Sequence, residues 1–223
     1  MAKGKLIVLE GIDGSGKSAN YRRLCMKLDR DKIPYRQIVF PRYSCESSAL
    51  IRMYLNGEFG AHPDDVNAYT ASTFYAVDRY ASYRSDWGKF YENGGLILSD
   101  RYTTSNAVHQ GCKLPKEERD AYFRWLYEFE FDRLGLPRPD RVIYLDMPTE
   151  KSVELLRSRE SSTNTTADIH EADTAYLAAC RGCALDAVLV LGWDRIPCME
   201  GNRLRGIEEL HEEIWGLTKD LLK

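Results

Sequence analysis

The chain has 223 residues, of which 43% are hydrophobic and 29% charged, and its formal net charge at pH 7 is −3. These values are ordinary for a globular protein of one large domain, and the lack of a basic excess argues against a general nucleic-acid binder. No apolar run approaches the roughly 18 residues of a membrane span, and the N-terminal run is too short for a signal peptide, so we expect a cytoplasmic protein with no membrane partner.

The first predicted elements are a strand at residues 6–10 and a helix at residues 18–30, with the stretch EGIDGSGKS between them. This stretch fits G-x-x-x-x-G-K-[ST], in which backbone N–H groups hold phosphate oxygens, the lysine reaches the terminal phosphates and the hydroxyl binds Mg²⁺. The start of the helix adds a partial positive charge to the same site. We therefore predict a loop that binds ATP with Mg²⁺ through Gly11, Gly14, Ser15, Gly16, Lys17, Ser18 and Ala19.

Asp13 lies in the middle of this loop. A carboxylate beside a phosphate site should repel the ligand. Either the side chain points into water, or it has a second role.

Further apolar runs predict strands at residues 37–40, 95–100 and 141–146, and a weaker one at 195–198. Helical patterns separate them, notably at residues 117–134, 174–191 and 207–222. This alternation predicts an α/β fold with a parallel sheet of about five strands, helices on both faces, and all ligand-binding strand ends on one edge. With no linker or repeat in the sequence, we expect a single domain over residues 1–223. Cys180 and Cys183 fall on one predicted helix without further zinc ligands at the usual spacing, so we expect small buried thiols.

The third strand is followed by SDRYTTSNAVHQG. Asp100 at the strand end is suited to hold a water on the metal, and Arg101 to bind a second phosphate as a two-pronged fork. If a helix follows, its polar residues stand one turn apart and form an edge that can face a base. These residues are Ser105, Asn106, His109 and Gln110.

Five segments in order resemble the thymidylate kinase family: EGIDGSGKS, FPR at 40–42, FYAVDR at 74–79, DRYTTSNAVHQG at 100–111 and PRPDRVIYLDMPTE at 137–150. The resemblance extends to about residue 183. It implies a P-loop NTPase fold, transfer of the γ-phosphate of ATP to dTMP in the presence of Mg²⁺, the products dTDP and ADP, and a homodimer.

The resemblance also implies roles for single residues. Asp13 would lie beside the acceptor's sugar and the metal, and Arg42 and Arg101 would clamp the acceptor phosphate. Arg79 would reach the edge of the thymine. An aromatic ring four residues before that arginine would stack on the base, which is Tyr75, with Phe74 as a competing assignment. The metal would be held by Ser18, Asp100 and Asp13.

Two positions depart from the family pattern. A tyrosine that helps to exclude a 2′-hydroxyl is common where this chain has His109, and a threonine usually stands at Ala19. Asn106 matches a position that some members use for the base. Discrimination against ribose is therefore the least determined part of the expected specificity.

A cation on the transferring group is needed, and the loop has Gly14 where some family members carry an arginine. The expected source is a mobile lid at about residues 157–173, with Arg159 or Arg157 as the catalytic arginine. Lys17, Asp13 and Arg101 complete the expected catalytic set. Two other functions stay open: a kinase for another nucleotide or nucleoside, and a nucleotide-binding regulator without catalysis.

Overall fold

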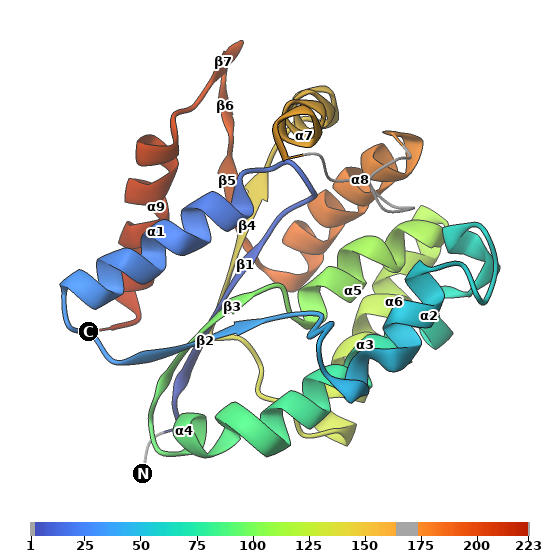
Figure 1. Cartoon of the computed structure of the whole chain (residues 1–223), viewed down its shortest axis with the longest axis horizontal. Coiled ribbons are helices and arrows are strands. Elements are labelled where there is room, and N and C mark those ends of the chain that lie inside the picture. Colours follow the sequence, from blue (N-terminus) through green and yellow to red (C-terminus); the bar gives the residue numbers. More distant parts are fainter. Residues whose placement is uncertain (1–2, 164–173, 223) are drawn as a thin grey trace.

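A computed structural model describes residues 3–163 and 174–222 of the chain. Its centre is a five-stranded sheet in the order β2-β3-β1-β4-β5, and each neighbouring pair is parallel (Figure 1). This confirms the predicted P-loop type of α/β fold. The strands are β1 (Lys5–Glu10), β2 (Tyr35–Val39), β3 (Leu96–Asp100), β4 (Arg141–Asp146) and β5 (Asp194–Pro197).

The position of each strand in the sheet explains how strong its signal in the sequence is. β1, β3 and β4 are central and almost wholly buried, which requires the continuous apolar runs that predicted them. β2 and β5 are the edge strands, and each has a single buried residue, Ile38 and Ile196, among exposed or partly exposed ones. The weak signal for β5 is therefore that of an edge strand.

Helices cover both faces of the sheet, as Figure 1 shows with α1 and α9 on one side and α5, α6 and α8 on the other. Ile7 and Leu9 of β1 pack in the core under α1 and α9, whereas Leu6 and Val8 face α6 and α8. The helices are α1 (Lys17–Arg30), α2 (Ala49–Leu55), α3 (Ala68–Ser82), α4 (Gly88–Glu92), α5 (Thr103–His109), α6 (Lys116–Tyr127), α7 (Thr149–Thr163), α8 (Thr174–Leu191) and α9 (Ile207–Asp220).

Apart from shifts of one or two residues at the ends of strands and helices, two elements differ from the sequence prediction. The helix expected over 117–134 is α-helical only to Tyr127 and continues as a π-helical turn, Glu128–Arg133. A small antiparallel hairpin, β6 (Met199–Glu200) and β7 (Arg203–Leu204), was not predicted because two-residue strands carry no measurable periodicity.

Within the described residues, α8 alone is long and apolar enough to cross a membrane, by length and hydropathy only: 18 residues with a mean hydropathy of 1.5. Its inner face belongs to the core, where Cys180 and Cys183 are fully buried as expected. Its charged residues pair with neighbouring elements, Arg181 with Asp146 and Asp186 with Arg119. One face of α8 thus packs against the core, and 33% of its residues are buried. The expectation that no apolar run approaches the length of a membrane span does not hold for this helix.

The parallel arrangement brings the ends of β1, β3 and β4 to one edge of the sheet. Glu10, Asp100 and Asp146 are the last residues of these strands, and all three are buried. The glycine loop follows β1 at this edge and leads into α1. The candidate site is built here.

Candidate functional site

The glycine loop has the backbone that a phosphate cradle needs. Gly14 and Gly16 have φ angles of 78° and 79°, which L-residues with side chains rarely adopt. A Cβ on Gly14 would also lie 2.5 Å from the carbonyl oxygen of Ser152. The loop is thus closed tightly against the start of α7 and opens toward the N-terminus of α1.

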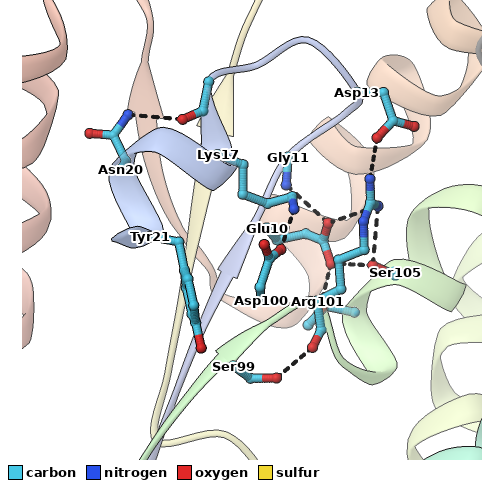
Figure 2. Close-up of polar contacts among 12 residues, drawn as sticks. Glu10, Gly11, Asp13, Lys17, Asn20, Tyr21, Ser99, Asp100, Arg101 and Ser105 are labelled. Atoms are coloured by element: carbon cyan, nitrogen blue, oxygen red, sulfur yellow. Dashed lines mark hydrogen bonds and ion pairs between the residues drawn. The ribbon is translucent and has the colours of Figure 1, made fainter. Parts of the chain in front are cut away.

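Lys17 and Asp100 form a buried ion pair between the loop and the end of β3 (Figure 2). Burial lowers the pKa of Lys17, and the nearby Arg101 lowers it further, while Asp100 and Glu10 act in the opposite direction. A phosphate that reached this lysine would supply the negative charge that offsets its loss of hydration.

Asp13 does not point into water. Its carboxylate pairs with Nη2 of Arg101, across from the end of β3, as Figure 2 shows. Burial alone would lower the pKa of Arg101, but Asp13 and Glu10 hold it above its ordinary value. The acid in the phosphate loop therefore orients a cation on the far side of the loop.

Arg101 has a strained backbone. Its φ is 67°, a left-handed conformation that costs a non-glycine residue about 1–3 kcal/mol. Two hydrogen bonds hold this backbone. The Arg101 N–H donates to the Leu9 carbonyl at 3.2 Å, and the Ser99 hydroxyl donates to the Arg101 carbonyl at 2.5 Å. The left-handed turn directs the guanidinium toward the glycine loop instead of along the strand.

Glu10 joins these parts from below. Its carboxylate is fully buried, accepts the Gly11 N–H at 2.9 Å, and lies 3.7 Å from Nη1 of Arg101. The hydroxyls of Thr104 and Ser105 each donate to it at 2.7 Å. One carboxylate thus fixes the loop, Arg101 and the first turn of α5 relative to one another.

Two cavities meet at Asp13, which lines both. The larger, about 370 Å³, is bounded by the glycine loop, α7, β7 and α9. Of the residues expected to bind ATP, those from Gly14 to Ala19 line it, whereas Gly11 does not. Apolar side chains form its far wall, among them Met147, Leu155, Leu156, Leu204 and Ile207.

The second cavity, about 250 Å³, lies between α3 and α5. It collects most of the residues expected to bind the acceptor nucleotide. They are Asp13, Tyr75, Arg79, Arg101, Ser105, Asn106, His109 and Gln110. The carbonyl oxygen Oε1 of Gln110 is buried and has no hydrogen-bond partner among the described residues, so an acceptor for a ligand donor is available here.

The structure distinguishes Tyr75 from Phe74, the two candidates for the ring that stacks on the base. Tyr75 lines the second cavity, whereas Phe74 packs with Tyr54 and Phe59 outside it, with ring centroids 6.4 and 5.7 Å apart. Only Tyr75 of the two is positioned beside a ligand in that cavity.

Arg42 is not among the residues that line the second cavity. Its guanidinium and backbone N–H both bind Asp78 of α3, at 3.3 and 2.8 Å. Its neighbours Pro41 and Tyr43 do line the cavity. Arg42 would have to leave Asp78 in order to bind an acceptor phosphate.

The expected lid lies partly outside the described residues, which end at 163 and resume at 174. Arg157 is on α7 and its side chain is exposed. Arg159 is on the same helix, but its side chain is outside what the structure describes. The start of α7 is fixed to the loop, because the Ser152 hydroxyl donates to the Asp13 carbonyl.

The sequence did not reveal several residues of the site. Tyr43 lines the second cavity, Asp78 pairs with Arg42, and Glu130 pairs with Arg79. Tyr43 follows the FPR segment directly, which was the one signal for it. The two acids lie 36 and 51 residues from their partners, on elements whose packing no local pattern specifies.

Comparisons with known proteins agree with this geometry. The family model for thymidylate kinase matches residues 9–192. The thymidylate kinase of Mycobacterium tuberculosis is 30% identical over 190 residues, which cover 84% of this chain and 87% of the relative. A probable thymidylate kinase of Thermococcus onnurineus is 27% identical over 97% of this chain and 98% of its own.

Among solved structures, the thymidylate kinase of Candida albicans has the same fold, with a TM-score of 0.71 at 20% identity over 99% of this chain and 93% of that one. The family model covers most of the chain, and the matches to the two relatives cover 87% and 98% of the relatives' own length. The chain therefore belongs to the thymidylate kinase family of phosphotransferases.

Proposed function

We propose that the protein transfers the γ-phosphate of ATP to dTMP with the help of Mg²⁺ and yields dTDP and ADP. The observation that carries this is the meeting of the two cavities at Asp13, with the glycine loop on one side and Arg101 on the other. Phosphoryl transfer requires that donor and acceptor phosphates face each other with cations between them.

The larger cavity, which we call the donor cavity, fits a nucleoside triphosphate with its metal. Ser15 Oγ and Asn20 Oδ1 are buried in its wall without a partner among the described residues. Gly11 and Gly14 cannot carry side chains in this loop, because a Cβ would lie 2.5 Å from Ser15 Oγ or from the Ser152 carbonyl oxygen. Ser18, Asp100 and Asp13 supply the oxygen ligands that Mg²⁺ prefers. When bound, the metal neutralises charge on the phosphates.

The second cavity, which we call the acceptor cavity, has side chains suited to bind a thymine nucleotide. Tyr75 offers a face for stacking, worth about 1–3 kcal/mol. Arg79 offers N–H donors for a base carbonyl, and Gln110 offers an acceptor for an imide N–H. Arg101 supplies the cation for the acceptor phosphate.

The chain has to orient the two phosphates and neutralise their charge, because an anionic acceptor oxygen needs no general base. Lys17 and Arg101 are each paired with a carboxylate in the structure, Asp100 and Asp13. Incoming phosphates would compete with these carboxylates for the same cations. The pairing keeps both side chains in place before substrate binds.

We infer that an arginine of α7 completes the charge neutralisation. Leu155 and Leu156 of this helix line the donor cavity, which supports an arginine of the same helix as the cation for the transferring group. Replacing the catalytic one of Arg157 and Arg159 by alanine should lower kcat about 10³-fold. Replacing the other should leave kcat within a factor of a few.

We also propose a homodimer. Tyr69, Val77 and Tyr80 are large, exposed side chains along α3, and a second copy would cover them. Val77→Lys should shift the molar mass from dimer to monomer in light scattering. The matched change Leu189→Lys, on α8, should not.

The test of the proposed activity is ADP release with ATP and Mg²⁺ across dTMP, dUMP, UMP, dCMP, AMP and thymidine. Strong turnover on dTMP with weak turnover on dUMP is the expected result. A preference for another acceptor would make the protein a sibling kinase with His109 as the first suspect, and ATP binding without any turnover would make it a regulator.

A further inference from the structure

Three side chains outside the catalytic set form a cluster behind the acceptor cavity: His109, Cys112 and Cys180. The sulfurs of Cys112 and Cys180 are 3.5 Å apart, and both thiols are free. The same Cys180 sulfur lies 3.5 Å from Nδ1 of His109. The Cys112 thiol also donates to the His109 carbonyl at 3.3 Å.

The cluster connects two elements that border the site. Cys112 lies in the 3-10 turn Gly111–Lys113, which continues α5 directly, and Cys180 lies on α8. α5 carries Ser105, Asn106 and His109 of the acceptor cavity. Anything that moves this turn therefore acts on the wall of that cavity.

His109 links the thiols to the acceptor-side cation. Its Nε2 lies 2.9 Å from Nη1 of Arg101. A guanidinium has no acceptor, so Nε2 must carry the lone pair and Nδ1 the proton, which then faces the Cys180 sulfur. The contact chain runs from Cys112 through Cys180 and His109 to Arg101.

The two thiols are chemically unequal. Cys112 is partly exposed, and the hydrogen bond from Cys180 lowers the pKa of its thiol. Cys180 is fully buried, and burial raises the pKa of its thiol. Cys112 is therefore the thiol that reacts first, and Cys180 is placed to react second.

We propose that Cys112 and Cys180 form a reversible disulfide that weakens binding of the acceptor nucleotide. The oxidant is a low-molecular-weight disulfide. The Cys112 thiolate attacks one of its sulfurs and releases the first thiol, then Cys180 loses its proton, attacks the Cys112 sulfur and releases the second. Two protein thiols and one disulfide become one protein disulfide and two small thiols.

The bond would change the site because its geometry differs from the contact it replaces. A disulfide is about 2.05 Å long, so the two sulfurs must approach by well over 1 Å from their present separation. The Cys180 sulfur is then drawn away from the Nδ1 proton of His109, and the turn after α5 is drawn toward α8. Both effects loosen the support of Arg101.

The chemical part of the proposal can be tested without any activity. The protein is treated with oxidised glutathione, and free thiols are counted together with peptide mapping by mass spectrometry. We expect a Cys112–Cys180 disulfide that dithiothreitol reverses, and none in Cys112→Ser or in Cys180→Ala. Cys45→Ser is the matched control, a partly exposed thiol with no sulfur neighbour among the described residues, and it should oxidise like the parent.

The functional part rests on the proposed dTMP kinase activity. Oxidation should raise KM for dTMP at least 5-fold with a smaller change in KM for ATP, and dithiothreitol should reverse it. The Cys112→Ser protein should keep its KM under the same treatment. No disulfide between these two residues, or a disulfide that leaves KM for dTMP unchanged, overturns the inference. An inactive reduced protein would instead overturn the proposed function, because the thiol count does not depend on activity.

Discussion

The guanidinium of Arg79 and the carboxylate of Glu130 form a two-pronged ion pair buried beneath the acceptor cavity, with Nε–Oε2 and Nη2–Oε1 distances of 2.7 and 2.5 Å. Glu130 also accepts the Thr103 hydroxyl at 2.7 Å and faces the Asn106 amide at 3.4 Å. It thereby fixes two residues of the cavity, Arg79 and Asn106. Its role in binding a base is indirect, because it orients the N–H donors of Arg79 and Asn106.

Glu130→Gln should destabilise the protein by about 3 kcal/mol, because removing one partner leaves a buried charge without compensation. Arg79 would also lose its fixed orientation. The factor by which KM for dTMP rises should therefore be about ten times the factor for ATP. Urea unfolding and steady-state kinetics measure the two effects.

Glu128→Gln is the matched control, two residues away. Glu128 pairs with Arg133 on the surface, with side chains 56% and 73% exposed, so its loss should change stability by less than about 1 kcal/mol. Equal losses of unfolding free energy for Glu130→Gln and Glu128→Gln would contradict the prediction that the buried pair contributes more to stability than the exposed pair.

Arg101 provides a test of backbone strain separate from function. Arg101→Gly and Arg101→Ala both remove the guanidinium, so both should lose at least 100-fold in kcat/KM for dTMP. They differ in the left-handed φ of 67°, which glycine adopts without strain. Arg101→Gly should therefore be more stable than Arg101→Ala by about 1 kcal/mol in urea unfolding. The reverse order would mean that the left-handed conformation does not persist.

Neighbouring rings allow a paired test of base stacking. Tyr75→Ala should raise KM for dTMP about 10-fold, because this ring lines the acceptor cavity. Phe74→Ala should instead cost about 2 kcal/mol or more in unfolding free energy, because that ring packs against Tyr54 and Phe59. If Phe74→Ala has the larger effect on KM, the two roles are interchanged.

The sequence was most informative where function fixes both residue type and spacing. The glycine loop, Asp100 and Arg101 lie at the ends of buried parallel strands, and the apolar runs that mark those strands also mark their ends. Partners chosen by tertiary packing were not predictable. Glu130 lies in a π-helical turn and meets Arg79 only because α3 and α6 both pack against α5.

The same limit applies to Cys112 and Cys180. The C-x-x-C spacing drew attention to Cys180 and Cys183, which share a helix face and are both buried. The sulfur that actually contacts Cys180 comes from residue 112, 68 positions earlier. Spacing along one helix does not indicate what a second element brings to it.

Lys113 gives the protein a pH dependence of stability with a defined sign. Its ammonium donates to the Tyr54 hydroxyl at 2.9 Å and to the Val66 carbonyl at 2.8 Å. Burial lowers the pKa of Lys113 to about 8, from an ordinary value of 10.5. Between these two pH values the unfolded chain binds more protons at this site than the folded chain, so this lysine makes stability rise with pH in that window. Below the folded pKa both states are charged and its contribution is constant.

Lys113→Met should remove this contribution. The difference in unfolding free energy between parent and variant should therefore shift in favour of the parent as the pH rises from about 8 to about 10. Comparing each variant with its parent at the same pH cancels the tyrosines, whose titration opposes the trend. Lys116→Met, three residues away with a side chain 76% exposed, should show no such shift. A flat difference for Lys113→Met would mean that its ammonium keeps the pKa of an exposed lysine, because only a folded-state pKa below the unfolded one can create the slope.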